Sequence, residues 1–152
     1  MYLLKSVSKI AGQVEFTLIG SRPSVICKPL DEALARYRWI YSLPHDKILE
    51  EMRNHDVLVL PSLFEGFVLV ILEAMSQGLP VITTDNSGGS EVVNNGESGF
   101  IIPMCSVEPI VEKISLLSQN RDILIYMGMQ AQKRASLSGW EKHRRDIINA
   151  LS

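Results

Sequence analysis

The sequence predicts an α/β domain in which a mostly parallel β-sheet lies between two layers of helices. Short apolar runs alternate along the chain with segments whose apolar residues recur at helical spacing, which is the pattern of a parallel sheet. The clearest strand, 57–60, is apolar at every position, as expected when helices cover both faces of the sheet. The 152 residues suffice for about one domain and no linker divides them, so we expect a single domain over 1–152.

The composition is that of an ordinary folded domain. Hydrophobic residues make up 46% and charged residues 21%, and the formal charge of −2 argues against a general binder of nucleic acids or membranes. Cys27 and Cys105 have neither CxxC spacing nor a histidine cluster nearby, so we expect no metal site and a reduced, cytoplasmic setting. No apolar run reaches the length of a membrane span, and Lys5 and Lys9 interrupt the apolar residues that a signal peptide would need.

The N-terminal half is expected to begin with a helix. A sheet of this kind normally begins with a strand at its centre, so that first strand appears missing, and two strand edges would then be open to self-association. The expected elements are a helix over 2–11 that ends at Gly12, a strand over 16–19, a polar connection containing Pro23 and Pro29, a strand over 38–41, a helix starting at 44–46, and the strand 57–60.

The C-terminal half is expected to finish the sheet and then to become helical. Gly78, just after a helical pattern and just before Pro80, is a typical helix end. Trp39 and Trp140 are expected in the core. The expected elements are a helix over 69–77, a strand over 81–84, a short helix over 91–94, a strand over 99–102, an apolar helical stripe over 107–117, a helix over 121–135 and a terminal helix from Trp140.

Two carboxylates mark the segment with the most chemical content. Glu65 lies in the loop after the strongest strand, and Glu73 follows it after seven residues, within the next helix. Ligands of open α/β sheets bind at that edge, and the backbone N–H groups of a loop and helix start suit a diphosphate. Gly66 permits close approach of the backbone, and the carboxylates are strong acceptors for sugar hydroxyls. Chance spacing, with Glu73 merely favouring the helix dipole, is the alternative explanation.

Further motifs follow in a fixed order. Glu73 continues as Glu-Ala-Met, then comes the strand-forming segment 78–82 (Gly-Leu-Pro-Val-Ile), and then the double glycine of 88–91 (Gly-Gly-Ser-Glu). With Glu65 and the Asn-Gly turn at 95–96, this series resembles the donor site of family 4 glycosyltransferases. The likeness covers nearly the whole chain and implies the Rossmann-like C-terminal domain of the GT-B fold.

The resemblance implies roles for individual residues. Glu65 would contact the hydroxyls of the transferred sugar and act as the catalytic residue, and Glu73 would bind the ribose hydroxyls. The segment Tyr41, Ser42, Leu43 and Pro44 would lie beside the base. His45 adjoins this segment, although a surface histidine is the favoured interpretation. The other expected donor-binding residues are Ser62, Gly66, Phe67, Val68, Gly88 and Gly89.

The resemblance also implies an activity: transfer of a glycosyl group from a nucleotide-diphosphate sugar, with retention of configuration. An N-terminal acceptor-binding domain would be the partner, and the full-length enzyme would be cytoplasmic, peripheral at the inner membrane. The sequence has no Asp-x-Asp motif, so we expect no metal cofactor. A non-catalytic nucleotide-sugar-binding module and a sugar-nucleotide epimerase of the same fold are the alternatives.

Two departures from the family pattern stand out. Val68 occupies a position where the family usually has glycine, and Val70 one where it often has proline. The Arg and Lys that clamp the diphosphate in the family would precede Met1, and neither Lys5 nor Lys9 takes their place. The chain alone is therefore expected to bind donor weakly and to turn over little.

Overall fold

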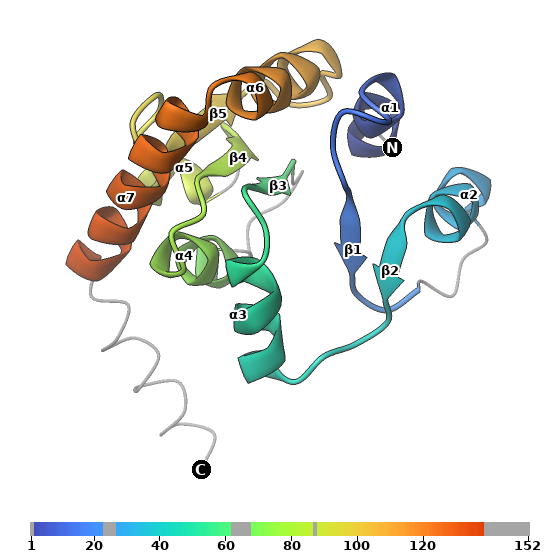
Figure 1. Cartoon of the computed structure of the whole chain (residues 1–152), viewed down its shortest axis with the longest axis horizontal. Coiled ribbons are helices and arrows are strands. Elements are labelled where there is room, and N and C mark those ends of the chain that lie inside the picture. The colour runs from blue at the N-terminus through green and yellow to red at the C-terminus, as the bar shows by residue number, and fades with distance from the viewer. Residues whose placement is uncertain (1, 23–26, 62–67, 87, 139–152) are drawn as a thin grey trace.

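The computed structural model of the chain describes residues 2–22, 27–61, 68–86 and 88–138. In these ranges helices and parallel strands alternate, and helices lie on both sides of the strands (Figure 1). The elements are α1 (Tyr2–Lys9), β1 (Thr17–Ile19), α2 (Lys28–Arg36), β2 (Arg38–Ile40), α3 (His45–Arg53), β3 (Leu58–Leu60), α4 (Val68–Ser76), β4 (Val81–Thr84), α5 (Gly89–Val92), β5 (Gly99–Ile102), α6 (Glu108–Gln119) and α7 (Arg121–Leu137).

The strands form two separate parallel sheets. β1 pairs with β2, and β4 lies between β3 and β5 in the second sheet. Within the described ranges, β1 and β3 each have a strand on one side only, and they are the nearest strands of the two sheets in Figure 1. The sequence predicts one parallel sheet, whereas the described strands form two. The ring of His55 reaches across this division, since its Nε2 lies 2.8 Å from the Thr17 hydroxyl.

The core lies on both faces of the three-stranded sheet. All four residues of β4 are buried, and successive side chains point to opposite faces. Ile82 belongs to a cluster with α6, whereas Val81 belongs to a cluster with α4, and α7 contributes to both. Complete burial of one such isoleucine contributes about 1.5–3 kcal/mol. This packing fixes α4, the helix that carries Glu73.

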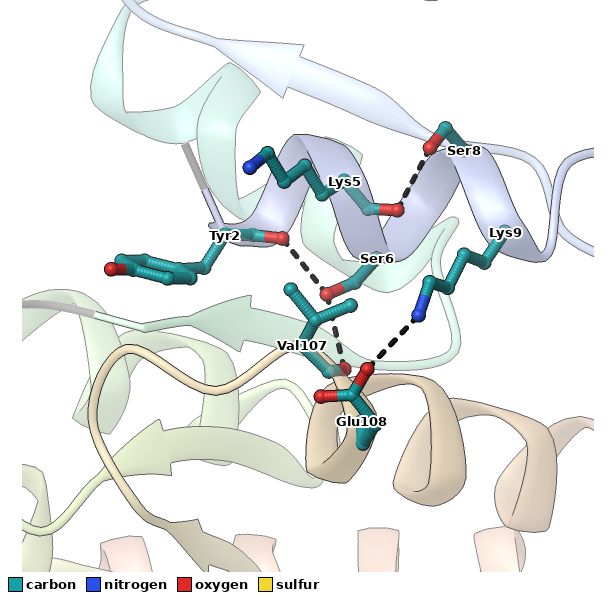
Figure 2. Close-up of polar contacts among 7 residues, drawn as sticks. All are labelled: Tyr2, Lys5, Ser6, Ser8, Lys9, Val107 and Glu108. Atoms are coloured by element: carbon teal, nitrogen blue, oxygen red, sulfur yellow. Dashed lines mark hydrogen bonds and ion pairs between the residues drawn. The ribbon is translucent and has the colours of Figure 1, made fainter.

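Helix α1 is held against the start of α6 by the contacts in Figure 2. The fully buried Ser6 hydroxyl lies 2.9 Å from the carbonyl oxygen of Tyr2 and 3.2 Å from that of Val107. Lys9 also forms a 3.0 Å ion pair with Glu108, but both side chains are largely exposed. Exposed ion pairs contribute little to stability, so the buried serine is the more specific of the two contacts.

Three expectations about the N-terminal half need correction. The connection containing Pro29 includes α2, because proline at the first turn of a helix loses no hydrogen bond. Trp39 lies on the short sheet with 37% of its surface exposed, instead of in the core. β3 is only half-buried, since no strand covers its second edge among the described residues.

Most other elements agree closely with expectation. β4 and β5 have the expected bounds, and Gly78 follows α4 with a φ of 84°. The expected terminal helix from Trp140 lies outside the described residues. Cys27 and Cys105 are free thiols, and no helix in the described ranges is long and apolar enough to cross a membrane.

Candidate functional site

The candidate site lies where the carboxyl ends of β3, β4 and β5 meet, because ligands of open α/β sheets bind at that edge. The chain leaves β3 at Pro61, and α4 begins at Val68. Four of the expected site residues fall between these two positions. Ser62, Glu65, Gly66 and Phe67 lie outside the described residues.

Glu73 is the one charged residue in an otherwise largely apolar helix. It is the sixth residue of α4, and the residues on either side of it, Leu72 and Ala74, are buried. The influence of the helix dipole fades beyond the first turn, so the dipole does not explain an acidic residue here. Only 13% of the Glu73 side chain is exposed. A carboxylate so enclosed costs free energy unless a hydrogen-bond donor satisfies it.

His45 supplies such a donor. Its Nε2 lies 2.7 Å from Oε1 of Glu73, although the two residues are 28 positions apart in the sequence. Because an ionised carboxylate only accepts hydrogen bonds, the proton of this contact resides on Nε2. His45 was expected to be an ordinary surface histidine. Its side chain is 49% exposed, but it is paired with the central residue of the candidate site.

A second polar contact joins α3 to α4 about two turns further along α3. Nη1 of Arg53 donates to Oε1 of Gln77 at 2.9 Å. Met52, Ile71 and Met75 belong to one buried cluster between these contacts, with Ile48 and Leu49 packed against it. The two helices therefore meet through an apolar interface with a polar contact at each end, which fixes where α3 begins.

The segment from Tyr41 to Pro44 connects β2 to α3 and ends directly before His45. Tyr41 is 62% exposed, and its ring stands edge-on to that of Trp39, with centroids 6.2 Å apart. Nε1 of Trp39 donates to the carbonyl oxygen of Gly20 at 3.0 Å. The carbonyl of Pro44 accepts the first hydrogen bond of α3. The segment is thus anchored at both ends, and Ser42 and Leu43 lie between the anchors.

A bidentate ion pair connects the two elements that flank this segment. Nη1 and Nη2 of Arg38 in β2 donate to the two carboxylate oxygens of Glu51 in α3, at 2.6 and 2.8 Å. The hydrogen bond from the guanidinium is the main reason why the pKa of Glu51 lies below its ordinary value of 4.5, and the same bond raises the pKa of Arg38. The two parallel hydrogen bonds restrict the orientation of α3 relative to β2.

The pair predicts a pH-dependent stability. A carboxyl with a lowered pKa stabilises the fold above its unfolded pKa and loses that contribution as the pH falls through its folded pKa. We expect Arg38→Ala to lower the free energy of unfolding at neutral pH, with a difference from wild type that shrinks as the pH falls below about 4.5. Urea unfolding at several pH values measures this. Arg36→Ala is the control, since that guanidinium lies over the Tyr37 ring and its effect should not follow this titration.

Val68 and Gly88, both expected to border the donor, are in contact. Gly88 precedes α5, and a Cβ atom added there would overlap Cγ2 of Val68. The side chain of Val68 therefore occupies the space beside Gly88, and the adjoining Gly89 is buried. The structure brings these two residues together from positions 20 residues apart in the sequence. It also gives Val68 a packing role against the double-glycine turn.

This contact predicts a coupled pair of substitutions. Gly88→Ala should destabilise the chain by about 1–2 kcal/mol through overpacking, because a β-branched side chain in a helix has essentially one rotamer. The backbone of Gly88 is helical (φ −56°), so an alanine meets no conformational penalty there. The double variant Val68→Ala/Gly88→Ala should be no less stable than Val68→Ala alone. Additive effects in denaturant unfolding would contradict this.

One cavity of the described part of the chain lies beside the group of expected site residues. It has a volume of about 330 Å³ and opens near the carboxyl ends of the three-stranded sheet, at Pro61, Thr84 and Ile102. Its other walls are mainly apolar and come from α1, β1 and α2, with Leu3, Leu18 and Leu30 among them. None of the expected donor-binding residues that the structure describes lines it. Sequence reasoning missed this cavity because its walls carry no polar motif.

Comparison with known proteins supports the sequence resemblance. A family model described as "Glycosyl transferases group 1" matches residues 2–134. The sucrose synthase of Melioribacter roseus is 43% identical over 117 residues, which are 69% of this chain and 15% of the relative. An N-acetylgalactosaminyltransferase of Campylobacter jejuni, named for N,N'-diacetylbacillosaminyl-diphospho-undecaprenol, is 30% identical over 134 residues, or 86% of this chain and 35% of the relative. The chain thus spans about a third or less of these relatives.

Solved structures share the fold. The sucrose-phosphate synthase of Thermosynechococcus elongatus superposes with a TM-score of 0.79 at 22% identity, covering 99% of this chain and 41% of that one. The Anabaena protein HepE, solved with UDP-glucose, gives 0.76 at 19% identity over 98% and 44%. The C-terminal domain of a group 1 glycosyl transferase, LpcC of Francisella tularensis, gives 0.77 at 19% identity over 90% and 76%.

Proposed function

Because this chain belongs to the glycosyl transferases group 1 family, we propose that it holds the nucleotide-diphosphate-sugar donor of a retaining glycosyltransferase. One observation carries the proposal: the segment 41–44 directly precedes His45, whose ring contacts Glu73. A nucleoside has two parts, a base and a ribose, directly joined. The segment and the carboxylate proposed to receive them are likewise adjacent.

The proposed chemistry relies on orientation and charge. Glu73 would accept hydrogen bonds from the ribose hydroxyls, and Glu65 would contact the transferred sugar. Backbone N–H groups at 66–68 would face the diphosphate, and Gly88 and Gly89 would border the pocket. Such a site accelerates transfer by aligning the donor and acceptor and by stabilising the leaving diphosphate. No metal would be needed.

The acceptor would be bound by a separate N-terminal domain. The chain spans 15% of one curated relative named above and 35% of the other, so the whole enzyme's acceptor and product are part of the proposal. Association of two chains is a further proposal. The free edges of β1 and β3 in the described part of the chain support it, because unpaired strand edges favour pairing.

The test is calorimetric titration of the chain with UDP, GDP and the corresponding nucleotide sugars, in buffer containing a chelator. Wild type should bind one of these nucleotides. Glu73→Ala should weaken that binding by about 1.5–3 kcal/mol, roughly 10- to 150-fold, because hydrogen bonds to a charged acceptor are lost.

Glu112→Ala is the matched control, because this carboxylate lies on α6 with 68% of its side chain exposed. It should leave nucleotide affinity unchanged. A folded wild-type chain that binds no nucleotide, or a Glu73→Ala variant that binds as well as wild type, would contradict the proposal. Isomerised nucleotide sugar formed without an acceptor would favour the epimerase alternative.

A further inference from the structure

The Glu73 carboxylate is held from one side before any ligand arrives. Oε1 lies 2.7 Å from Nε2 of His45, and the rest of α4 offers no charged side chain to compete for it. The ring belongs to the first residue of α3, which is fixed against α4 by the Arg53–Gln77 contact and the apolar interface. The donor of this hydrogen bond therefore stands on a rigid element.

One donor leaves most of the carboxylate available. An ionised carboxylate has about four lone-pair sites, of which His45 uses one on Oε1. Among the residues that the structure describes, no other donor is bound to the carboxylate, so Oε2 and the remaining site of Oε1 can accept hydrogen bonds. A vicinal diol donates two hydrogen bonds, and the carboxylate has enough remaining acceptor sites to receive both. A glutamate side chain that is already ordered also loses less conformational entropy when a ligand binds.

The chemistry of histidine suits this place better than that of lysine or arginine. Because His45 is at the N-terminus of α3, a permanent positive charge would be unfavourable beside the helix dipole. The imidazole of His45 contacts one oxygen of the carboxylate through a single ring nitrogen. The nearest charged residues of α3 are Asp46 and Lys47, and Lys47 is paired with Glu50 at 2.7 Å. Hydroxyl donors form stronger hydrogen bonds with a charged acceptor than with a neutral one.

We propose that His45 is a positioning residue, which holds the Glu73 carboxylate in the orientation that receives the 2′- and 3′-hydroxyls of the donor's ribose. This inference rests on the proposed function, since it assigns a neighbour to the residue that would bind ribose. It goes further by giving His45 a role as a link. His45 directly follows the segment 41–44 and contacts Glu73, so it fixes the position of the base-binding segment relative to the ribose-binding carboxylate.

The test compares two ligands that differ only in the ribose hydroxyls. Wild type, His45→Ala, His45→Gln and Lys47→Ala are titrated with the nucleoside diphosphate that wild type binds, UDP or GDP, and with its 2′,3′-dideoxy form. His45→Ala should weaken binding of the ribonucleotide about 2- to 12-fold, the range of one net hydrogen bond, and should barely change binding of the dideoxynucleotide. His45→Gln restores an N–H donor and should recover part of the loss.

Lys47→Ala removes an exposed cation two residues further along the same helix and should change neither affinity. Equal losses for both nucleotides in His45→Ala would show a general disturbance of the fold and overturn the inference. Binding that depends on Glu73 but not on His45 would overturn the inference and leave the proposed function standing. A wild-type chain that binds no nucleoside diphosphate would overturn both.

Discussion

Gly128→Ala is expected to destabilise the chain, although glycine to alanine within a helix normally adds about 1 kcal/mol of stability. Gly128 lies inside α7, where that helix crosses the end of α4. A Cβ atom at this position would overlap the carbonyl oxygen of Gly78 and lie 3.5 Å from its carbonyl carbon. Neither is the end of a flexible side chain, so α7 would have to move away from α4. We expect a net loss of about 1–3 kcal/mol.

Denaturant unfolding measures this loss as a lower midpoint at an unchanged slope. Met129→Ala is the control, because Met129 is the next residue of α7 and is 65% exposed. It should cost little, as surface substitutions do. A Gly128→Ala chain that is more stable than wild type would show that α7 and α4 can separate without loss. Nucleotide affinity should fall with the stability, since α4 carries Glu73.

Gly99→Ala is expected to be still more destabilising. Gly99 is the first residue of β5, opposite Val81 of β4. An added Cβ would overlap the carbonyl oxygen of Val81 and come within 2.9 Å of its amide nitrogen. Both atoms belong to the backbone of a fully buried strand. The two strands could accept the methyl group only by giving up part of their ladder, so the loss should be about 3 kcal/mol or more.

Amide hydrogen exchange of β4 and β5, together with denaturant unfolding, tests this expectation. The matched substitution is Ile101→Val, two residues further along the same strand, which should cost about 0.5–1.5 kcal/mol. If Gly99→Ala lowered the free energy of unfolding no more than Ile101→Val, the prediction based on the close approach of the two backbones would be wrong. Faster exchange should be largest in these two strands and should extend to β3, because β4 also shares a backbone ladder with β3.

Several elements could be predicted from the sequence because their signals are local. The bounds of β4 agree in every residue, since an apolar run lies between Pro80 and Asp85. α4 ends before Gly78, whose positive φ is favourable for glycine. A local signal was also available for α2. Pro29 at its start and apolar residues at helical spacing after it indicate a helix, although two prolines in one short stretch are also typical of a connection.

Burial was less predictable than secondary structure. Trp39 has the size and apolarity of a core residue, yet it lies on a two-stranded sheet with 37% of its surface exposed. The strand 57–60 has the composition of a strand covered on both faces, and β3 is half-buried. In both cases the residue types are those of a buried strand. Their exposure differs because of which elements pack beside them. Composition describes the residue and not its neighbours.

The sequence by itself determined the fold class, the order of the strands along the chain and the family resemblance, and it led to the prediction that Glu73 is a site residue. Only the tertiary structure decided which residues stand beside Glu73. His45 is 28 positions away, and a lone histidine at the start of a helix has no motif. Val68 and Gly88 likewise meet only because α4 and α5 pack together. Periodicity and turn signals follow from interactions between near neighbours in the chain. A contact between two helices depends on the packing of the whole core, which no short stretch of sequence encodes.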